Sequence, residues 1–390
     1  MSLEQLIKNK KAKVTIIGLG YVGLPTAFEL AKVGYQVFGI DKDKEKVDFI
    51  NQGKSYIKDI NSKELKKIVS SKKLKVYDSY KVLKDSDIVL ICLPTPLDKN
   101  KVPDVSYIKI AAEEIAKYLH KEQLIILESS SYPGTTREII LAKLEKKGFK
   151  IGKDFFLVFS PERIDPGNKK YKFKNISRVV GGITKKCTQL ATKFYKSFIN
   201  TQVLSLSSPE VAEMTKLLEN TFRLVNISMI NELSLLSSKM GIDIWEVIEA
   251  AKSKPFGFFP FYPSPKVGGH CCPLDPFYLS WKAKEYNFNT RFIDIAGDIN
   301  EQMPHFVVTK VILTLNLEKK AIRGSKVLIL GVSYKKDIGD TRESAAIDII
   351  PNLQKKGAKV DYFDSYVKNF EVQGKNLKSI KYKSNILKNY

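Results

Sequence analysis

Cysteine is scarce in this 390-residue sequence, which excludes a fold built on disulfides. The four cysteines are too few for a disulfide framework in so long a chain. Two of them, Cys271 and Cys272, are adjacent, and adjacent cysteines bridge each other only with strain. The scarcity is typical of a protein from a reducing compartment, and we expect a cytoplasmic location.

Long apolar runs are also missing. No run approaches the roughly 20 apolar residues that cross a bilayer, and charges interrupt the N-terminal stretch MSLEQLIKNKKAK before a signal-peptide core could form. We therefore expect no membrane association. The hydrophobic content of 43% is ordinary for a globular protein, and the length favours two or three domains of about 150 residues each.

Arginine is rare, although the net charge is +23. Only seven of the 65 basic residues are arginine, and the lysines are spread over nearly every segment. Nucleic-acid recognition depends heavily on arginine and on compact basic patches, so nucleic acid is not an expected partner. A positive surface would still attract a small dianionic substrate.

Residues 13–183 predict a parallel, doubly wound sheet. Short apolar runs alternate with amphipathic helical patterns, and such alternation is typical of βαβ units. The next pattern, residues 209–240, predicts one helix about 45 Å long between domains. Its apolar excess favours burial against a second subunit, so a homodimer or higher homo-oligomer is expected.

A second βα unit is predicted near the C-terminus, where KVLILGVSY (326–334) resembles KVTIIGLGY (13–21). Only 26 residues follow Asp364, so its sheet is expected to be small. The predicted fold is α/β, with two Rossmann-like doubly wound domains joined by a long central helix and a shortened C-terminal domain. We assign residues 1–205 to an N-terminal Rossmann domain, 206–305 to a central helical domain with the long helix and the cysteine loop, and 306–390 to a short C-terminal Rossmann-like domain.

The motif GLGYVG (18–23) predicts a dinucleotide site because it follows a strand and opens a helix. Gly18 would form the tight turn, Gly20 would let the pyrophosphate approach, and Gly23 would let the helix pack on the strand. The pyrophosphate would lie at the helix N-terminus, beside Tyr21 and Val22. Asp41, at the end of the second strand, would accept from the ribose hydroxyls and repel a 2′-phosphate. NAD is therefore predicted over NADP, and flavin is the other dinucleotide considered.

The stretch KVGGHCCPLDPF (266–277) predicts thiol chemistry, since Gly268 and Gly269 leave room for a substrate beside the two cysteines. The sequence LDPFYLSW predicts a helix whose N-terminus would favour a thiolate. A zinc site that uses His270 is an alternative, but it lacks the usual ligand spacing, and no metal is predicted. A buried structural cysteine is the other alternative.

Seven segments together resemble the nucleotide-sugar 6-dehydrogenases, over about 345 residues and in the family's order. They are GLGYVGLPTA, CLPTP, ESSSYPGTT, SPERIDPG, AEMTKLLENTFRLVNISMINE, VGGHCCPLDPFYL and GVSYKKDIGDTRES. GGHC and SPER look most like the UDP-N-acetylhexosamine branch. The resemblance implies oxidation of the C6 hydroxyl of a UDP-sugar to a carboxylate with two NAD, for the synthesis of surface polysaccharide precursors.

The resemblance also implies the catalytic roles. Cys271 would capture the intermediate aldehyde as a thiohemiacetal and then form a thioester, while Cys272 is interpreted as a packing variant. Lys216 and Asn220, four apart on one helix face, would stabilise the oxyanion and orient the substrate. An exposed helix surface is the alternative for that pair. Asp275 and Glu162 would activate water or act as a general base.

Further positions follow from the same match. Thr95 and Glu128 would line the nicotinamide and the reacting water, and Arg163 of SPER would contact substrate together with Glu162, Lys216, Asn220 and Gly268. Lys335 and Arg342, predicted to flank the last helix, would bind the UDP-sugar, and a surface helix capped by Asp340 or Thr341 is the alternative.

The sequence is compatible with three other functions. A UDP-glucose 6-dehydrogenase, from the other branch of the same family, is the first alternative. A single-step hydroxyacid dehydrogenase would share the glycine loop and the Lys216–Asn220 pair but need no thiol. A non-catalytic protein that binds NAD or a nucleotide sugar would release no NADH.

Overall fold

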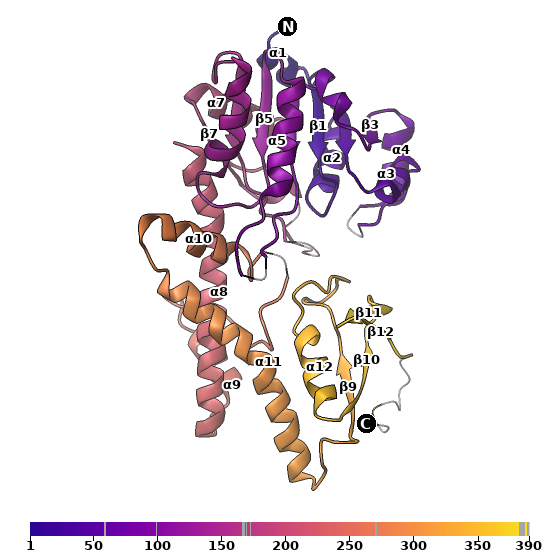
Figure 1. Cartoon of the computed structure of the whole chain (residues 1–390), viewed down its shortest axis with the longest axis vertical. Coiled ribbons are helices and arrows are strands. Elements are labelled where there is room, and N and C mark those ends of the chain that lie inside the picture. Colours follow the sequence, from indigo (N-terminus) through magenta and orange to yellow (C-terminus); the bar gives the residue numbers. More distant parts are fainter. Residues whose placement is uncertain are drawn as a thin grey trace. The chain divides into compact units, whose positions relative to one another are not determined.

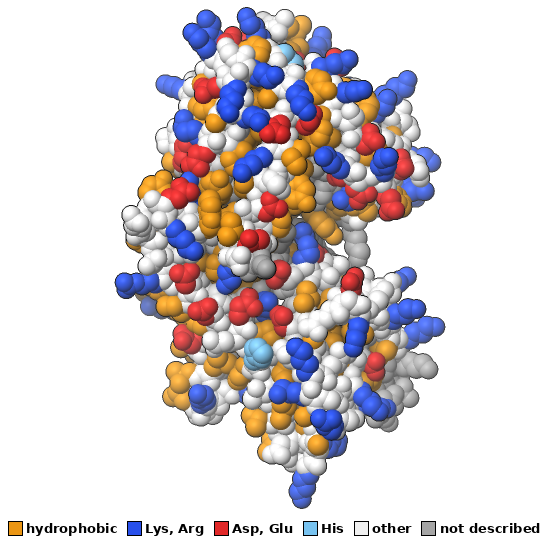
Figure 2. Space-filling view, viewed as in Figure 1, with side chains coloured by type: hydrophobic (Ala, Val, Ile, Leu, Met, Phe, Trp, Pro, Cys, Tyr) orange, Lys and Arg blue, Asp and Glu red, His pale blue; other side chains and the backbone are white. Residues whose placement is uncertain are grey.

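The computed structural model describes residues 1–57, 60–98, 100–165, 168, 170–171, 173–269, 271–381, 387 and 390 (Figure 1). The chain forms two compact units, residues 1–218 and 219–390. The division into segments 1–205, 206–305 and 306–390 remains a prediction. Figure 2 shows basic side chains dispersed over the visible face rather than gathered in one compact patch.

The first unit is built on an eight-stranded sheet of order β3-β2-β1-β4-β5-β6-β7-β8. Its strands are β1 (Lys13–Ile17), β2 (Gln36–Ile40), β3 (Leu74–Tyr77), β4 (Ile88–Ile91), β5 (Gln123–Leu127), β6 (Phe155–Phe159), β7 (Arg178–Gly182) and β8 (Val203–Leu206). All pairings are parallel except that of β6 with β7. Every residue of β4, β5, β6 and β7 is buried, as expected where helices cover both faces.

Helices flank this sheet and form a separate hydrophobic cluster on each face. They are α1 (Leu3–Lys8), α2 (Gly23–Lys32), α3 (Lys44–Asn51), α4 (Ser62–Ser70), α5 (Ser106–Tyr118), α6 (Ala142–Leu144) and α7 (Lys185–Lys196). Side chains of Ser2, Asp43, Asn61 and Thr184 cap four of them. The predicted doubly wound sheet is confirmed.

The long helix α8 (Pro209–Met240) has the predicted bounds, and the division between the two units falls within it. It is followed by α9 (Ile244–Lys252), α10 (Asp275–Ala283) and α11 (Arg291–Leu317). The sequence prediction gives no bounds for α11, which contains Pro304, a residue normally taken as a helix break. No helix among the described residues has the length and apolar character to span a bilayer.

The C-terminal βαβ unit consists of β9 (Lys326–Leu330), α12 (Ala346–Lys355) and β10 (Lys359–Phe363), with β9 and β10 parallel. A hairpin of β11 (Asn369–Val372) and β12 (Lys375–Lys378) packs on the same hydrophobic cluster. The small second Rossmann-like element is therefore confirmed. The predicted caps Asp340 and Thr341 are wrong, because α12 begins at Ala346 and the Asp340 carboxylate instead pairs with Arg342.

Candidate active site

The glycine loop between β1 and α2 has the shape that a dinucleotide requires. Gly18 has a φ of +91°, and a Cβ atom there would lie 2.6 Å from the carbonyl oxygen of Cys92. A Cβ atom at Gly23 would lie 1.9 Å from the carbonyl oxygen of Gly18. A Cβ atom at Gly20 would meet no atom within 4 Å, so this backbone is open to a ligand.

The N-terminus of α2 can accept an anion. Val22 precedes the helix and makes no side-chain cap hydrogen bond, so the capping position leaves the helix N-terminus open to an anion. Asp41 follows β2, and its carboxylate accepts hydrogen bonds from Leu19 N (2.9 Å) and Asp43 N (3.0 Å). A carboxylate held beside the glycine loop suits a ribose diol, so these residues fit NAD.

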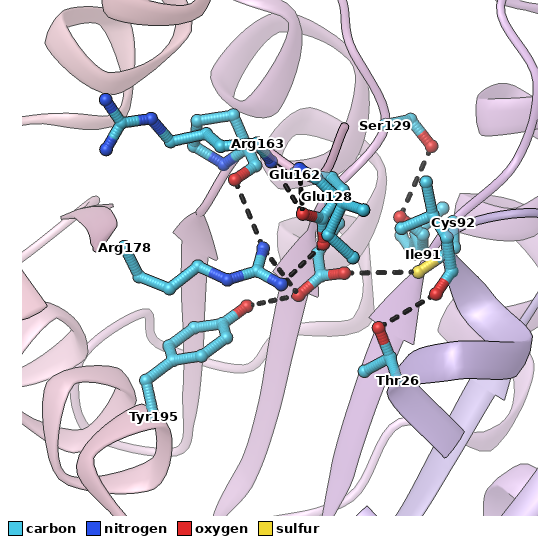
Figure 3. A network of polar contacts seen from close by, with 12 residues as sticks. Thr26, Ile91, Cys92, Glu128, Ser129, Glu162, Arg163, Arg178 and Tyr195 are labelled. Atoms are coloured by element: carbon cyan, nitrogen blue, oxygen red, sulfur yellow. Dashed lines mark hydrogen bonds and ion pairs between the residues drawn. The ribbon is translucent and has the colours of Figure 1, made fainter. Parts of the chain in front are cut away.

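A buried charge network lies beyond the carboxyl ends of β5 and β6 (Figure 3). Arg178, only 1% exposed, pairs with the Glu162 carboxylate and donates to the carbonyl of Pro161 at 3.2 Å. Its guanidinium also lies 3.8 Å from Glu128. The Glu128 carboxylate accepts from Tyr195 Oη at 2.6 Å. Burial raises the pKa of Glu128, and the charge of Arg178 opposes that increase.

Thr95 and Glu128, which were predicted to line the nicotinamide, both make hydrogen bonds to other residues of the first unit. The Glu128 carboxylate is also within 3.4 Å of Cys92 Sγ, and Thr95 donates to the carbonyl of Ser130 at 2.7 Å. Thr95 and Glu128 are both 2% exposed. Because both side chains are buried and hydrogen-bonded, they hold together the loops that follow β4 and β5.

Lys216 and Glu162 are brought together within the first unit. Lys216 is 7% exposed, and its ammonium donates to the backbone carbonyl of Glu162 at 2.6 Å. Both carboxylate oxygens of Glu162 are engaged, one by Arg178 and the other by the backbone N–H groups of Arg163 and Ile164, at 2.6 Å each. The alternative of an exposed helix surface is therefore wrong for Lys216. In this geometry Glu162 holds the turn that binds the lysine.

Asn220 and Asp275 are brought together in the second unit. Asn220 is 1% exposed and its amide donates to the carboxylate of Asp275, the first residue of α10. The backbone N–H of Asp275 donates to the carbonyl of Cys271 at 2.9 Å. The helix start therefore forms one turn with the preceding loop, residues 266–269 and 271–274, called the thiol loop below. Cys271 and Cys272 are half-buried cysteines outside any disulfide.

Arg223, which the sequence analysis did not predict as a site residue, contacts both Asn220 and Cys272. Its guanidinium donates to Asn220 Oδ1 and, through Nε, to Cys272 Sγ at 3.1 Å. The only sequence signal is its spacing of three residues from Asn220, which places both on one helix face. Arg178 and Tyr195 were missed as well, since nothing local links them to Glu128 or Glu162.

The thiol loop is anchored to the C-terminal domain. Lys266 is 2.9 Å from Asp348 and 3.5 Å from Glu301, and the N–H of Gly269 donates to the carbonyl of Arg342 at 3.0 Å. A Cβ atom at Gly268 would lie 2.7 Å from the carbonyl oxygen of Glu343. Gly268 is thus needed for backbone packing, in addition to any space it leaves for a substrate.

Lys335 and Arg342 lie in the segment between β9 and α12, before the helix rather than at its N-terminus. The guanidinium of Arg342 is about half exposed and pairs with Asp340 at 2.6 Å. Among the described residues, no group of three or more His, Cys, Asp and Glu side chains is placed to hold a metal ion. His270 lies outside the described residues.

Three domain models of one protein family match most of the chain. The UDP-glucose/GDP-mannose dehydrogenase family matches through its NAD binding domain at residues 12–199, its central domain at 210–302 and its UDP binding domain at 328–390. The chain belongs to the UDP-glucose/GDP-mannose dehydrogenase family. The resemblance seen in the motifs is confirmed, and so is NAD as the cofactor of this dehydrogenase.

The relatives of this dehydrogenase are similar over most of their length. UDP-N-acetyl-D-glucosamine 6-dehydrogenase of Pseudomonas aeruginosa is 35% identical over 92% of this chain and 84% of its own. UDP-N-acetyl-D-mannosamine dehydrogenase of Pyrococcus horikoshii is 38% identical over 91% and 84%. A solved structure of the UDP-D-ManNAc dehydrogenase from Pyrococcus horikoshii gives a TM-score of 0.85 at 36% identity, covering 91% of this chain and 84% of that one.

Proposed function

We propose that this dehydrogenase oxidises the C6 hydroxyl of a UDP-N-acetylhexosamine to the carboxylate, for the synthesis of surface polysaccharide precursors. The observation that carries the proposal is the turn at the start of α10, where Asp275 is fully buried, accepts from Asn220 and donates to the carbonyl of Cys271. A half-buried thiol on such a turn suits covalent capture of an aldehyde. The matched relatives named for N-acetylated UDP-sugars support that substrate class.

NAD, when bound, accepts a hydride in each of two oxidations. After the first, the Cys271 thiol adds to the C6 aldehyde, its proton passing to the new hydroxyl, and gives a thiohemiacetal. Loss of the C6 hydride and the hydroxyl proton then gives a thioester. Water adds to the thioester, the carboxylate is released and the thiol is restored. Covalent capture keeps the aldehyde from leaving between the two oxidations.

The surrounding residues take the remaining roles in this proposal. The Lys216 ammonium stabilises negative charge that develops on the C6 oxygen, and its contact with the Glu162 carbonyl holds it in one position. Asn220 orients the substrate, and Asp275 accepts the proton of the attacking water. Lys335 and Arg342 bind the diphosphate, and Arg163 contributes to substrate binding.

A homodimer is part of the same proposal. Helix α8 carries a stripe of exposed apolar side chains at intervals of three, four or seven residues: Val211, Met214, Leu218, Phe222, Met229, Leu233, Leu236 and Met240. Contiguous exposed apolar side chains mark interaction surfaces, and a second copy of the same helix would cover them. Light scattering after size exclusion should give twice the chain mass of 44.2 kDa, or a higher multiple.

The decisive experiment measures NADH and uronate formed from UDP-GlcNAc, UDP-ManNAc, UDP-GalNAc and UDP-glucose. We expect two NADH per uronate with an N-acetylated sugar, loss of turnover in Cys271→Ala, and the two-to-one ratio retained in Cys272→Ala. Preference for UDP-glucose would assign the other branch of the family. One NADH per substrate, or turnover that survives Cys271→Ala, would overturn the thiol mechanism, and binding without NADH would overturn catalysis altogether.

A further inference from the structure

The side chain of Arg223 contacts two elements of the candidate site at once. It lies on α8 three residues after Asn220, so both side chains project from one face of the helix. One guanidinium nitrogen, Nη2, donates to Asn220 Oδ1, and Nε donates to Cys272 Sγ at 3.1 Å. The rigid planar fork of arginine can make both contacts simultaneously, which a lysine cannot.

These contacts determine which way the Asn220 amide points. Its oxygen accepts from Arg223, and its nitrogen donates to Asp275 Oδ2. A half-turn of the amide would set its NH₂ group against the guanidinium and its oxygen against the carboxylate, and both contacts would be repulsive. Arg223 and Asp275 therefore hold the amide in one orientation, next to the turn that carries Cys271.

Cys272 has a part in the same arrangement. Its side chain packs against a small cluster formed by Leu224, Val267 and Ala296, and its sulfur accepts from Arg223. An aliphatic residue could fill the same space but could not accept a hydrogen bond. The sulfur thus links the thiol loop to α8 through the Arg223 guanidinium. A residue that only filled space at position 272 would not make this link.

Electrostatics supports the geometry. Burial alone would lower the pKa of Arg223, but the neighbouring thiols of Cys272 and Cys271 and the Asp275 carboxylate raise it. By reciprocity a fixed positive charge close to two thiols favours their ionised forms.

We propose that Arg223 is a positioning residue for the thiol chemistry, fixing the Asn220 amide on Asp275 and holding the Cys271–Cys272 loop through the Cys272 sulfur. This inference rests on the proposed function, in which Cys271 is the nucleophile. It adds a requirement for a guanidinium at position 223 and for a hydrogen-bond acceptor at position 272.

The test combines steady-state kinetics with alkylation of Cys271 by iodoacetamide, followed by mass spectrometry over a range of pH. For Arg223→Met we expect kcat to fall about 10- to 100-fold, the range expected for a lost hydrogen bond to a charged group. We expect KM for the UDP-sugar to change by less than about threefold, and Cys271 alkylation to require higher pH. Arg223→Lys should keep the alkylation profile, because it keeps the charge, but should lose kcat, because it lacks the fork. Arg291→Met, an exposed change on α11, is the matched control.

Cys272 supplies a second, milder comparison. Cys272→Ser keeps an acceptor and should stay within about threefold of the parent kcat, whereas Cys272→Ile fills the space without one and should fall further, by about 3- to 10-fold. Alkylation needs no substrate, so a wrong substrate assignment leaves that measurement intact. Parent-like kcat and alkylation in Arg223→Met, or equal kcat in Cys272→Ser and Cys272→Ile, would overturn the proposal.

Discussion

Replacing Arg178 should destabilise the first unit more than any surface substitution, because its guanidinium compensates two buried carboxylates. The side chain is 1% exposed, pairs with Glu162 and lies 3.8 Å from Glu128. Removing one partner of a buried ion pair leaves an uncompensated charge, at a cost of about 3–5 kcal/mol. The free energy of unfolding of Arg178→Met should fall by that amount near neutral pH.

The loss should also depend on pH. Burial already raises the pKa of Glu128 while Arg178 opposes it, so removing Arg178 raises that pKa further. A group whose folded-state pKa is raised contributes stability below its unfolded value, and that stability is lost as pH rises through the folded-state value. The destabilisation in Arg178→Met should therefore be largest at neutral pH and above, and should shrink as pH falls toward 5.

The assay has to observe the first unit. Both tryptophans, Trp245 and Trp281, belong to residues 219–390, so intrinsic tryptophan fluorescence would report the wrong unit. Hydrogen exchange of peptides from β6 and β7, followed by mass spectrometry, measures the intended one.

Arg137→Met is the matched control for Arg178→Met. Arg137 is 2.8 Å from Glu210, but its side chain is 48% exposed, so its loss should cost less than about 1 kcal/mol. The reasoning is refuted if the two variants lose equal protection, or if the loss in Arg178→Met is the same at pH 5 and pH 8.

Two further predictions concern a buried carboxylate and a glycine contact. Burial raises the pKa of Glu213 to about 7, against hydrogen bonds that lower it, so its contribution to stability is lost between pH 4.5 and 7. Relative to Glu213→Gln, the first unit should lose about 3 kcal/mol over that interval, and parallel pH curves from hydrogen exchange would contradict this. Gly268→Ala should destabilise the second unit by about 1–3 kcal/mol in urea unfolding followed by tryptophan fluorescence, because its Cβ would lie 2.7 Å from the Glu343 carbonyl oxygen. Gly339→Ala, with 3.4 Å to its nearest atom, is the control, and equal unfolding midpoints for the two variants would count against the steric argument.

The parts of the fold and site that depend on local sequence could be predicted. The glycine loop, Asp41 and α8 each lie in one continuous segment, and the residue spacing and apolar pattern of that segment are enough to predict them. The apolar-run criterion does not find β3 and β8, because each has only four residues and a polar residue interrupts each run, whereas the equally short β4 is wholly apolar and buried. A run that short has no periodicity that distinguishes a strand from a loop.

The charge network could not be predicted, because its members meet only through the order of the strands. Arg178 begins β7, while Glu128 and Glu162 follow β5 and β6, so their pairing depends on how three strands align. The contact of Arg223 with Cys272 likewise joins positions 49 residues apart. Such partners become visible only when the elements are placed in space.

Under the proposed mechanism, the anchoring of the thiol loop makes the UDP binding domain part of the catalytic apparatus as well as a binding module. The N–H of Gly269 donates to the backbone carbonyl of Arg342, and Gly268 packs against the carbonyl of Glu343. The contacts with residues 342 and 343 use backbone atoms, whereas the Tyr334 side chain also packs against Gly268 and Gly269. Side-chain changes at Lys335 and Arg342, the proposed diphosphate ligands, can therefore alter UDP-sugar binding while the attachment of the thiol loop persists. Under the proposed mechanism, substrate choice can therefore diverge while the position of Cys271 is kept.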